Sequence, residues 1–156
     1  MLVWGRNAQR VQALADTLEH QGLKAKPAAD LTDALSVADI VSCATTSREP
    51  LIVGQHLRPG THLDLVGAFT PEMRDTDDDA VCRSRRVRRY YAGAPKKAGD
   101  LLQPIAGGRW DASMICGDLH ELTNGLKSGR LSQQEITLFK SVGAAIEDLA
   151  AAYLLT

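Results

Sequence analysis

The chain has 156 residues and a formal net charge of −1, with 44% hydrophobic and 24% charged residues. This is the balance of a globular domain with a sizeable core, and the small net charge gives no overall field that would attract nucleic acid or an acidic surface. No apolar run reaches membrane-spanning length and the first residues lack a signal-peptide pattern, so we predict a cytoplasmic protein that binds neither nucleic acid nor membrane.

The first part of the chain alternates strand and helix signals. Residues 2–4 are a short apolar run that predicts a strand. Asn7 can then cap a helix over 8–21, where apolar residues recur at helical spacing, and Gly22 can end that helix. Residues 24–28 are a weak candidate for the second strand.

The alternation continues through the next forty or so residues. Residues 30–36 predict a short helix, 39–44 a strand that ends in a polar turn, and 61–66 a further strand that ends at Gly67. Strands that alternate with helices imply crossover connections and a parallel sheet with helices on both faces. The sequence therefore predicts an α/β, Rossmann-like fold.

The second half is less regular. Residues 87–91 are a candidate strand with an unusual number of charges, and 116–126 have a helical pattern. Residues 132–135 fit a helix capping box or a polar turn, 136–140 fit a strand or a helix, and 142–155 predict a helix. An acidic run precedes the candidate strand and a basic run extends into it, and their fields should cancel: Asp75, Asp77, Asp78 and Asp79, then Arg83, Arg85, Arg86, Arg88 and Arg89.

The cysteines and histidines do not have the spacing of a metal site. Cys43, Cys82 and Cys116 are odd in number and far apart, which fits neither a disulfide framework nor a zinc motif. We expect reduced, mostly buried thiols. The histidines show no paired ligand spacing either, so no metal site is predicted: His20, His56, His62 and His120.

The turn after the first strand is a candidate cofactor contact. Ligands of an open parallel sheet bind at the carboxyl ends of its strands, and NAD-binding folds present an acidic residue to the ribose after their second strand. The opening residues of this chain read as the second strand of such a fold, and Gly5, Arg6 and Asn7 occupy the place of the acidic residue that follows it. An arginine cannot accept the ribose hydrogen bonds, but it can bind a 2′-phosphate. Arg6 therefore favours NADP over NAD, with an ordinary surface arginine as the alternative.

Two further turns are candidates. The small hydroxyl residues Thr45 and Thr46 would let a cofactor approach the backbone, or they form an ordinary polar turn. Gly67 has no side chain to block a flat ring, which Phe69 or Thr70 would face; the alternative is a glycine needed only for backbone conformation. No Gly-x-Gly-x-x-Gly loop occurs to hold a pyrophosphate, so a complete cofactor site is not expected.

Four segments, taken in order, resemble the ornithine cyclodeaminase/mu-crystallin family. They are ADIVSCATTSREPLI at 38–52, LRPGTHLDLVGA at 57–68, AGDL at 98–101 and the tail at 129–153. Each segment is weak alone, but four in the family's order are specific. The resemblance covers essentially the whole chain and corresponds to the second half of a family member.

The resemblance implies a domain division and a set of cofactor contacts. Residues 1–140 would form a dinucleotide-binding domain whose first strand and glycine loop are missing, and 141–156 the C-terminal helix of a substrate and dimerisation domain, in a homodimer. The implied contacts are Gly5, Arg6 and Asn7 at the adenosine ribose, Thr45 and Thr46 along the cofactor, and Val66, Gly67, Ala68 and Ser141 near the nicotinamide.

The resemblance also bears on the reaction. Family cyclodeaminases place a catalytic aspartate where this chain has Phe69, which cannot act as acid or base, and a lysine where it has Met73. The sequence is more similar to the family's NADP-dependent reductases of cyclic ketimines, Δ1-pyrroline-2-carboxylate or Δ1-piperideine-2-carboxylate. The alternatives are an ornithine cyclodeaminase (ornithine to proline plus ammonia), an alanine dehydrogenase-like enzyme and a non-catalytic remnant that only folds or dimerises. No catalytic residue is assigned.

Overall fold

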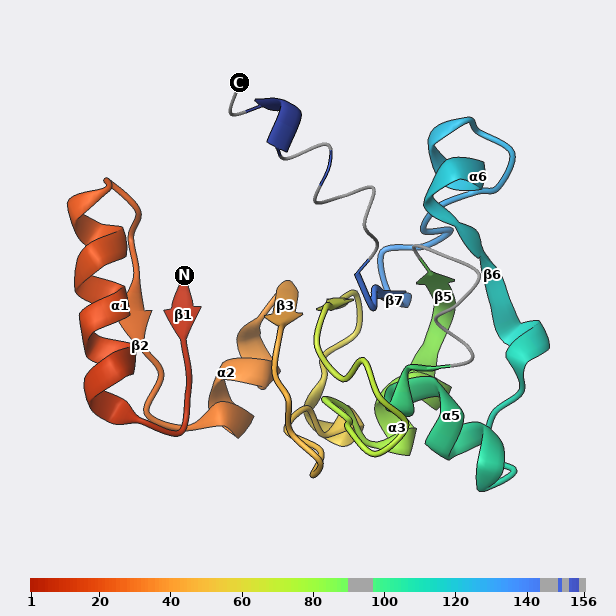
Figure 1. Cartoon of the computed structure of the whole chain (residues 1–156), viewed down its shortest axis with the longest axis horizontal. Coiled ribbons are helices and arrows are strands. Elements are labelled where there is room, and N and C mark those ends of the chain that lie inside the picture. The colour runs from red at the N-terminus through yellow and green to blue at the C-terminus, as the bar shows by residue number, and fades with distance from the viewer. Residues whose placement is uncertain (90–96, 144–148, 150–151, 155–156) are drawn as a thin grey trace. The chain divides into compact units, whose positions relative to one another are not determined.

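The computed structural model describes residues 1–89, 97–143, 149 and 152–154 (Figure 1). Two compact units divide the chain, Met1–Val37 and Ala38–Thr156, and each is described by itself. Both are α/β, with parallel strands and intervening helices. The longest described helix has 13 residues, and none in the described part is both long and apolar enough to cross a membrane.

The first unit is built around a strand–helix–strand motif. Strands β1 (Leu2–Val3) and β2 (Lys26–Pro27) pair in parallel, and helix α1 (Ala8–His20) connects them. Helix α1 begins as the sequence predicts, because the Asn7 side chain accepts a hydrogen bond from the Arg10 amide at 3.0 Å. The unit ends in the short helix α2, Leu31–Val37, which confirms the helix predicted near Asp30.

The second unit contains a five-stranded parallel sheet in the order β3-β4-β7-β5-β6. The last strand in sequence, β7, therefore lies in the middle, between β4 and β5. This order places the carboxyl ends of β3, β4 and β7 side by side. The strands are β3 (Ile40–Cys43), β4 (His62–Leu65), β5 (Ser84–Arg89), β6 (Ile115–Asp118) and β7 (Ile136–Lys140).

Helices and apolar side chains complete this unit. Its core lies against β4 and β7, where Leu63, Leu65 and Leu138 are fully buried. Asp77 caps helix α3 by accepting a hydrogen bond from the Ala80 amide at 2.8 Å. Within residues 38–89 and 97–143, the helices are η1 (Gly54–His56), α3 (Asp78–Arg83), α5 (Gly99–Ala106), η2 (Ala112–Met114) and α6 (Leu119–Thr123).

The helix predicted over residues 116–126 is wrong at its start. Cys116–Asp118 belong to β6, and α6 begins only at Leu119. The boundary is set by a capping box: the Asp118 carboxylate accepts the Glu121 amide at 2.9 Å, and the Glu121 carboxylate accepts the Asp118 amide at 3.1 Å. The helical pattern of the sequence extends across this boundary, so periodicity alone could not find it.

Other ambiguous elements are decided by pairing. Residues 136–140 form the strand β7, and 132–135 form a turn in which the Glu135 carboxylate accepts the Leu131 amide at 2.8 Å. The charged strand predicted over 87–91 is confirmed as far as residue 89, and its last two residues lie outside the described part. Most of the helix predicted over 142–155 also lies outside it, but 149 and 152–154 are helical. The three cysteines are free, as expected, but they are only partly buried, whereas the sequence predicts mostly buried thiols.

Candidate functional site

The candidate residues of the second unit meet at the ends of β3, β4 and β7. Thr45 follows β3, Val66 to Ala68 follow β4, and Ser141 follows β7. Backbone hydrogen bonds join these ends: the Ala68 amide donates to the Thr45 carbonyl at 3.0 Å, and the Ser141 amide donates to the last carbonyl of β4 at 2.9 Å. Thr46 is exposed on the same rim. The fold therefore gathers residues that are distant in sequence at one sheet edge.

The turn after β4 is pressed against the turn after β3. A Cβ atom built on Gly67 would lie 2.2 Å from the Thr45 carbonyl oxygen, 2.4 Å from the Thr45 amide nitrogen and 2.7 Å from Asp75 Oδ2. No side chain fits there, and the obstacles include backbone that cannot turn aside. Gly67 is thus required for the close approach of two turns, a reason that differs from both readings of the sequence.

The next residue, Ala68, has a left-handed backbone with φ of 47° and is fully buried. This region is unfavourable for a residue with a Cβ atom, and such strain persists only where surrounding contacts impose it. The outer face of the turn is apolar, since Val66 and Phe69 are 43% and 47% exposed. The turn therefore presents an apolar surface on a tightly held backbone.

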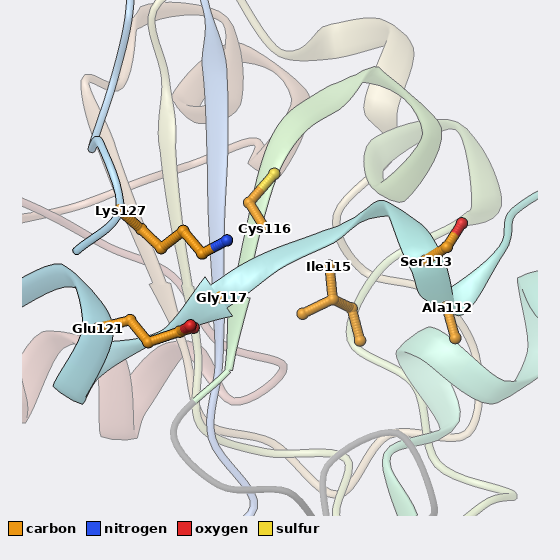
Figure 2. A pocket seen from close by; sticks show the side chains of 7 residues that line it. All are labelled: Ala112, Ser113, Ile115, Cys116, Gly117, Glu121 and Lys127. Carbon is orange, nitrogen blue, oxygen red and sulfur yellow. The ribbon is translucent and has the colours of Figure 1, made fainter.

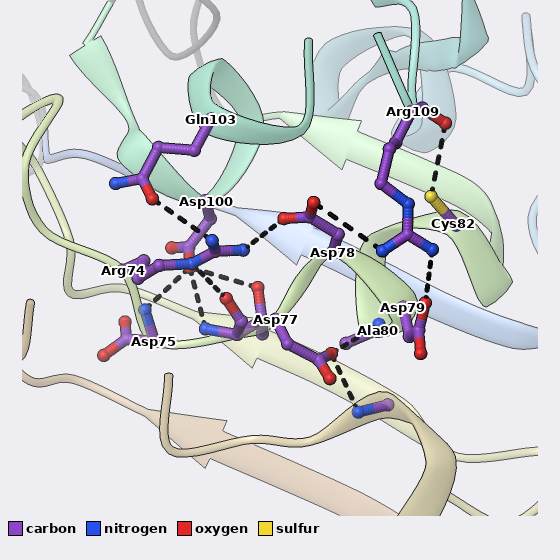
Figure 3. Close-up of polar contacts among 12 residues, drawn as sticks. Arg74, Asp75, Asp77, Asp78, Asp79, Ala80, Cys82, Asp100, Gln103 and Arg109 are labelled. Carbon is purple, nitrogen blue, oxygen red and sulfur yellow. Dashed lines mark hydrogen bonds and ion pairs between the residues drawn. The ribbon is translucent and has the colours of Figure 1, made fainter. Parts of the chain in front are cut away.

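Beneath this turn lies a fully buried charged cluster formed by Lys140, Asp100 and Asp75. The Lys140 ammonium is 2.9 Å from Asp100 Oδ2 and donates a hydrogen bond to the Gly67 carbonyl. Asp100 Oδ1 accepts the backbone amides of Asp75 at 2.7 Å and Thr76 at 2.9 Å (Figure 3). The cluster thus connects β7, the first turn of α5 and the β4 turn.

The Asp75 carboxyl group extends the cluster to the β3 turn. The Thr45 hydroxyl donates to Asp75 Oδ1 at 2.5 Å, whereas Asp75 Oδ2 has no hydrogen-bond partner among the described residues and faces Gly67. Burial raises the pKa of Asp75 above its ordinary value of 3.8, and the Asp100 charge adds to this effect. Burial, with Asp75 nearby, raises the pKa of the Cys43 thiol to about 12.

The raised pKa of Asp75 predicts a specific pH dependence. Below pH 3.8 both the folded and the unfolded chain hold this proton, so the shift has no effect there. Above that pH the unfolded chain loses the proton first, and the free energy of unfolding falls until the pH passes the raised pKa of the folded state. We expect Asp75→Asn to remove this fall. In urea titrations from pH 3 to 8, the stability of the variant relative to the unchanged chain should increase with pH.

The contribution of other carboxylates cancels in this comparison, because both proteins carry them. Asparagine keeps an oxygen that can accept the Thr45 hydroxyl, so the main contact of the side chain is retained. A stability difference that stays constant between pH 3 and 8 would show that Asp75 does not titrate differently on folding.

The rest of the acidic run has structural roles. Asp77 caps α3 and also accepts the Gly54 amide at 2.9 Å. The Asp78 carboxylate pairs with Arg74 at 2.7 Å, and Asp79 pairs with Arg109 at 2.6 Å (Figure 3). Partly exposed pairs of this kind add little to stability. The sequence groups Asp75 with these aspartates, and only its burial distinguishes it.

Sequence reasoning also missed Lys140 and Asp100. Each carried a signal: Lys140 follows Ile136–Phe139, a run that is apolar except for Thr137, and Asp100 lies within the AGDL segment at 98–101. A charged residue in a buried strand must have a partner. The sequence could therefore have indicated that a partner exists, although not which residue it is.

The remaining candidates, Gly5, Arg6 and Asn7, lie in the first unit between β1 and α1. The Asn7 side chain is occupied by capping. The Arg6 side chain is exposed and makes no hydrogen bond or ion pair with any described residue. No described residue therefore competes with an anion for the Arg6 guanidinium, and its contact with a ribose phosphate stays a prediction.

A separate polar hollow lies at β6, at the opposite edge of the sheet from β3 (Figure 2). Its lining includes one acidic residue, Glu121, one basic residue, Lys127, and none of the predicted site residues. Its lining residues are Ala112, Ser113, Ile115, Cys116, Gly117, Glu121 and Lys127.

Comparisons of sequence and structure with known proteins find matches over essentially the whole chain. The sequence profile described as "Ornithine cyclodeaminase/mu-crystallin family" matches residues 1–156. The chain is 42% identical to Protein SAR DEFICIENT 4 of Arabidopsis thaliana, over 99% of this chain and 48% of that protein. It is also 42% identical to the Delta(1)-pyrroline-2-carboxylate reductase of Paracoccus denitrificans, over 94% of this chain and 46% of that protein.

A solved structure is similar over the same extent. The Delta(1)-pyrroline-2-carboxylate reductase of Thermococcus litoralis, in complex with NADH and L-proline, superposes with a TM-score of 0.91 at 36% identity. The match covers 98% of this chain and 48% of that one. The chain thus spans about half the length of the curated relatives it matches.

Proposed function

The chain belongs to the ornithine cyclodeaminase/mu-crystallin family, and from that membership we propose that it serves in the reduction of cyclic ketimine carboxylates by a nicotinamide dinucleotide. The substrate class is Δ1-pyrroline-2-carboxylate or its six-membered analogue. The names of two similar proteins, from Paracoccus and Thermococcus, support this class. The observation that carries the proposal is Phe69, which is half exposed on the rim where a cyclodeaminase needs a carboxylate.

Each of the two units has exposed residues whose chemistry suits one part of such a cofactor. Val66 and Phe69 form an apolar face suited to a flat ring, and the exposed Arg6 guanidinium suits a ribose phosphate. When bound, the reduced nicotinamide supplies the hydride that reduces a carbon–nitrogen double bond. The chain's own contribution is to bind, to orient and to exclude water.

Orientation falls to the β4 turn. Gly67 and Ala68 are held by the Thr45 backbone and the buried cluster, so the apolar face above them has a fixed position. A fixed ring reduces the entropy lost on reaching the reactive geometry. Phe69 covers part of this rim with apolar surface, which keeps water from the reacting carbon. We further propose that residues 141–156 belong to a substrate and dimerisation domain and that the protein is a homodimer.

A preference for NADP is part of the proposal, and Arg6 supports it. The Thermococcus reductase was solved with NADH, which has no 2′-phosphate, so the proposed preference of this chain for NADP depends on Arg6. We expect Arg6→Ala to weaken NADPH binding about tenfold to a hundredfold, the loss of one charge-assisted phosphate contact, and to leave NADH binding unchanged. Fluorescence titration of the purified chain with each dinucleotide measures both values.

The matched control for Arg6 is Arg10→Ala, which removes an exposed arginine in the first turn of α1. This change should leave the preference for NADPH in place. Equal weakening of NADPH and NADH by Arg6→Ala would contradict a contact with the 2′-phosphate.

The reaction itself is tested by turnover. Oxidation of NADPH in the presence of Δ1-pyrroline-2-carboxylate supports the reductase, whereas release of ammonia from ornithine supports a cyclodeaminase. Cofactor binding with neither reaction, at any substrate concentration, would favour a chain that folds and binds without catalysis. The assay should include the longest natural form of the protein, because the chain spans half of its relatives.

A further inference from the structure

Lys140 is a lysine whose side chain is completely buried. Lys140 ends the central strand β7, and its side chain has no contact with solvent. An ammonium group in the interior loses its hydration, and an ion pair recovers that loss only with good geometry and further hydrogen bonds. An apolar residue at the end of β7 would fill the space at lower cost. The lysine must therefore supply something that an apolar residue cannot.

The two partners of Lys140 indicate what it supplies. One is Asp100 Oδ2, at 2.9 Å, which balances the charge. The other is the carbonyl oxygen of Gly67, in the turn after β4. Charge balance alone needs only the carboxylate, so the carbonyl contact is the additional element. It fixes the direction of the peptide group between Gly67 and Ala68.

That peptide group is where the backbone needs to be held. Ala68 has the unfavourable φ of 47°, and Gly67 lies against the Thr45 backbone with no space to spare. These two residues lie in the chain between Val66 and Phe69, whose side chains form the exposed apolar pair on the rim. A rotation of this peptide would move both side chains. The contact from Lys140 opposes that rotation from below.

The carboxylate partner of Lys140, Asp100, is also held in place by hydrogen bonds. Asp100 Oδ1 accepts three hydrogen bonds, from the amides of Asp75 and Thr76 and from the Thr76 hydroxyl at 3.1 Å. Asp75 in turn accepts the Thr45 hydroxyl at 2.5 Å. The ammonium is therefore positioned by groups from several segments, and the carbonyl it holds cannot shift without disturbing them.

We propose that Lys140 is a positioning residue, which holds the Gly67 carbonyl so that the turn from Val66 to Phe69 presents its apolar face to the nicotinamide ring at a fixed position. The contact of this turn with a nicotinamide ring rests on the proposed function. The restraint that Lys140 places on the turn does not, because it depends only on contacts within the chain.

The first test uses the unchanged chain. Hydrogen exchange, measured by NMR, should show the Ala68 amide protected to within about tenfold of the Leu63 amide in β4. An Ala68 amide that exchanges a hundredfold faster than Leu63 would overturn the proposal, because the turn would then open without the strand.

The second test separates positioning from charge balance. Lys140→Met leaves Asp100 buried without a counter-charge, and it is expected to unfold or destabilise the chain for that reason alone. The double variant Lys140→Met, Asp100→Asn removes both charges, keeps the Oδ1 acceptor and still lacks the contact with Gly67. We expect it to fold cooperatively, with Ala68 exchange at least tenfold faster and with Leu63 and Leu138 exchange unchanged.

The same double variant should bind NADPH and NADH at least tenfold more weakly, and in the turnover assay the cofactor KM should rise more than kcat falls. The control Lys127→Met removes an exposed lysine of the same unit and should change none of these values. A double variant with wild-type Ala68 protection and wild-type cofactor affinity overturns the proposal. If the unchanged chain binds neither dinucleotide while Ala68 exchange still responds, the proposed function fails and the holding of the turn stands.

Discussion

Replacing Gly67 with alanine is expected to destabilise the chain by about 2–4 kcal/mol and to abolish binding of a nicotinamide dinucleotide. The added methyl group would lie 2.2 Å from the Thr45 carbonyl oxygen and 2.4 Å from the Thr45 amide nitrogen. Both are backbone atoms between β3 and β4, so the clash cannot be relieved by rotating a side chain. The two strand ends must separate, and the rim that they form separates with them.

Urea denaturation gives the stability, and fluorescence titration of the surviving folded protein gives the affinity. Gly107→Ala is a matched control: Gly107 has a right-handed helical backbone, with φ of −76°, and a Cβ there would meet its nearest neighbour at 3.4 Å. We expect that change to lie within about 0.5 kcal/mol of the unchanged chain. A Gly67→Ala protein of unaltered stability would mean that the two turns are not in contact.

Removal of the Asp100 side chain should have an equally large effect. Asp100→Ala is expected to cost about 3–5 kcal/mol, since it leaves the Lys140 ammonium buried without a counter-charge. It also removes the acceptor for the amides of Asp75 and Thr76, which are both fully buried. We therefore expect a chain that is largely unfolded at 37 °C, measured by far-UV circular dichroism and by loss of cooperative melting.

Asp79 provides the control for this prediction. It also pairs with a basic residue, Arg109, at 2.6 Å, but both side chains are about half exposed. Water can replace that contact, so Asp79→Ala should melt at nearly the same temperature as the unchanged chain. If Asp79→Ala and Asp100→Ala were equally mild, the Asp100–Lys140 pair would not be buried in solution.

Local elements were predictable because their causes are local. The start of α1 follows from Asn7, whose side chain reaches an amide three residues away. The strands β3 and β4 follow from short apolar or alternating runs bounded by turns. The error at Cys116–Asp118 is instructive, since the capping box that starts α6 lies inside a continuous helical pattern and competes with pairing to β5.

The sequence by itself determined the α/β fold, the main strands and helices of its first half, the rim at the strand ends and the family. These depend on periodicity, capping and short motifs, which act between residues near each other in the chain. Only the tertiary structure decided that β7 lies beside β4, that Asp75 differs from its acidic neighbours and that Lys140 contacts Gly67, 73 residues away. Such contacts depend on which segments the sheet order brings together, and no local pattern records that order.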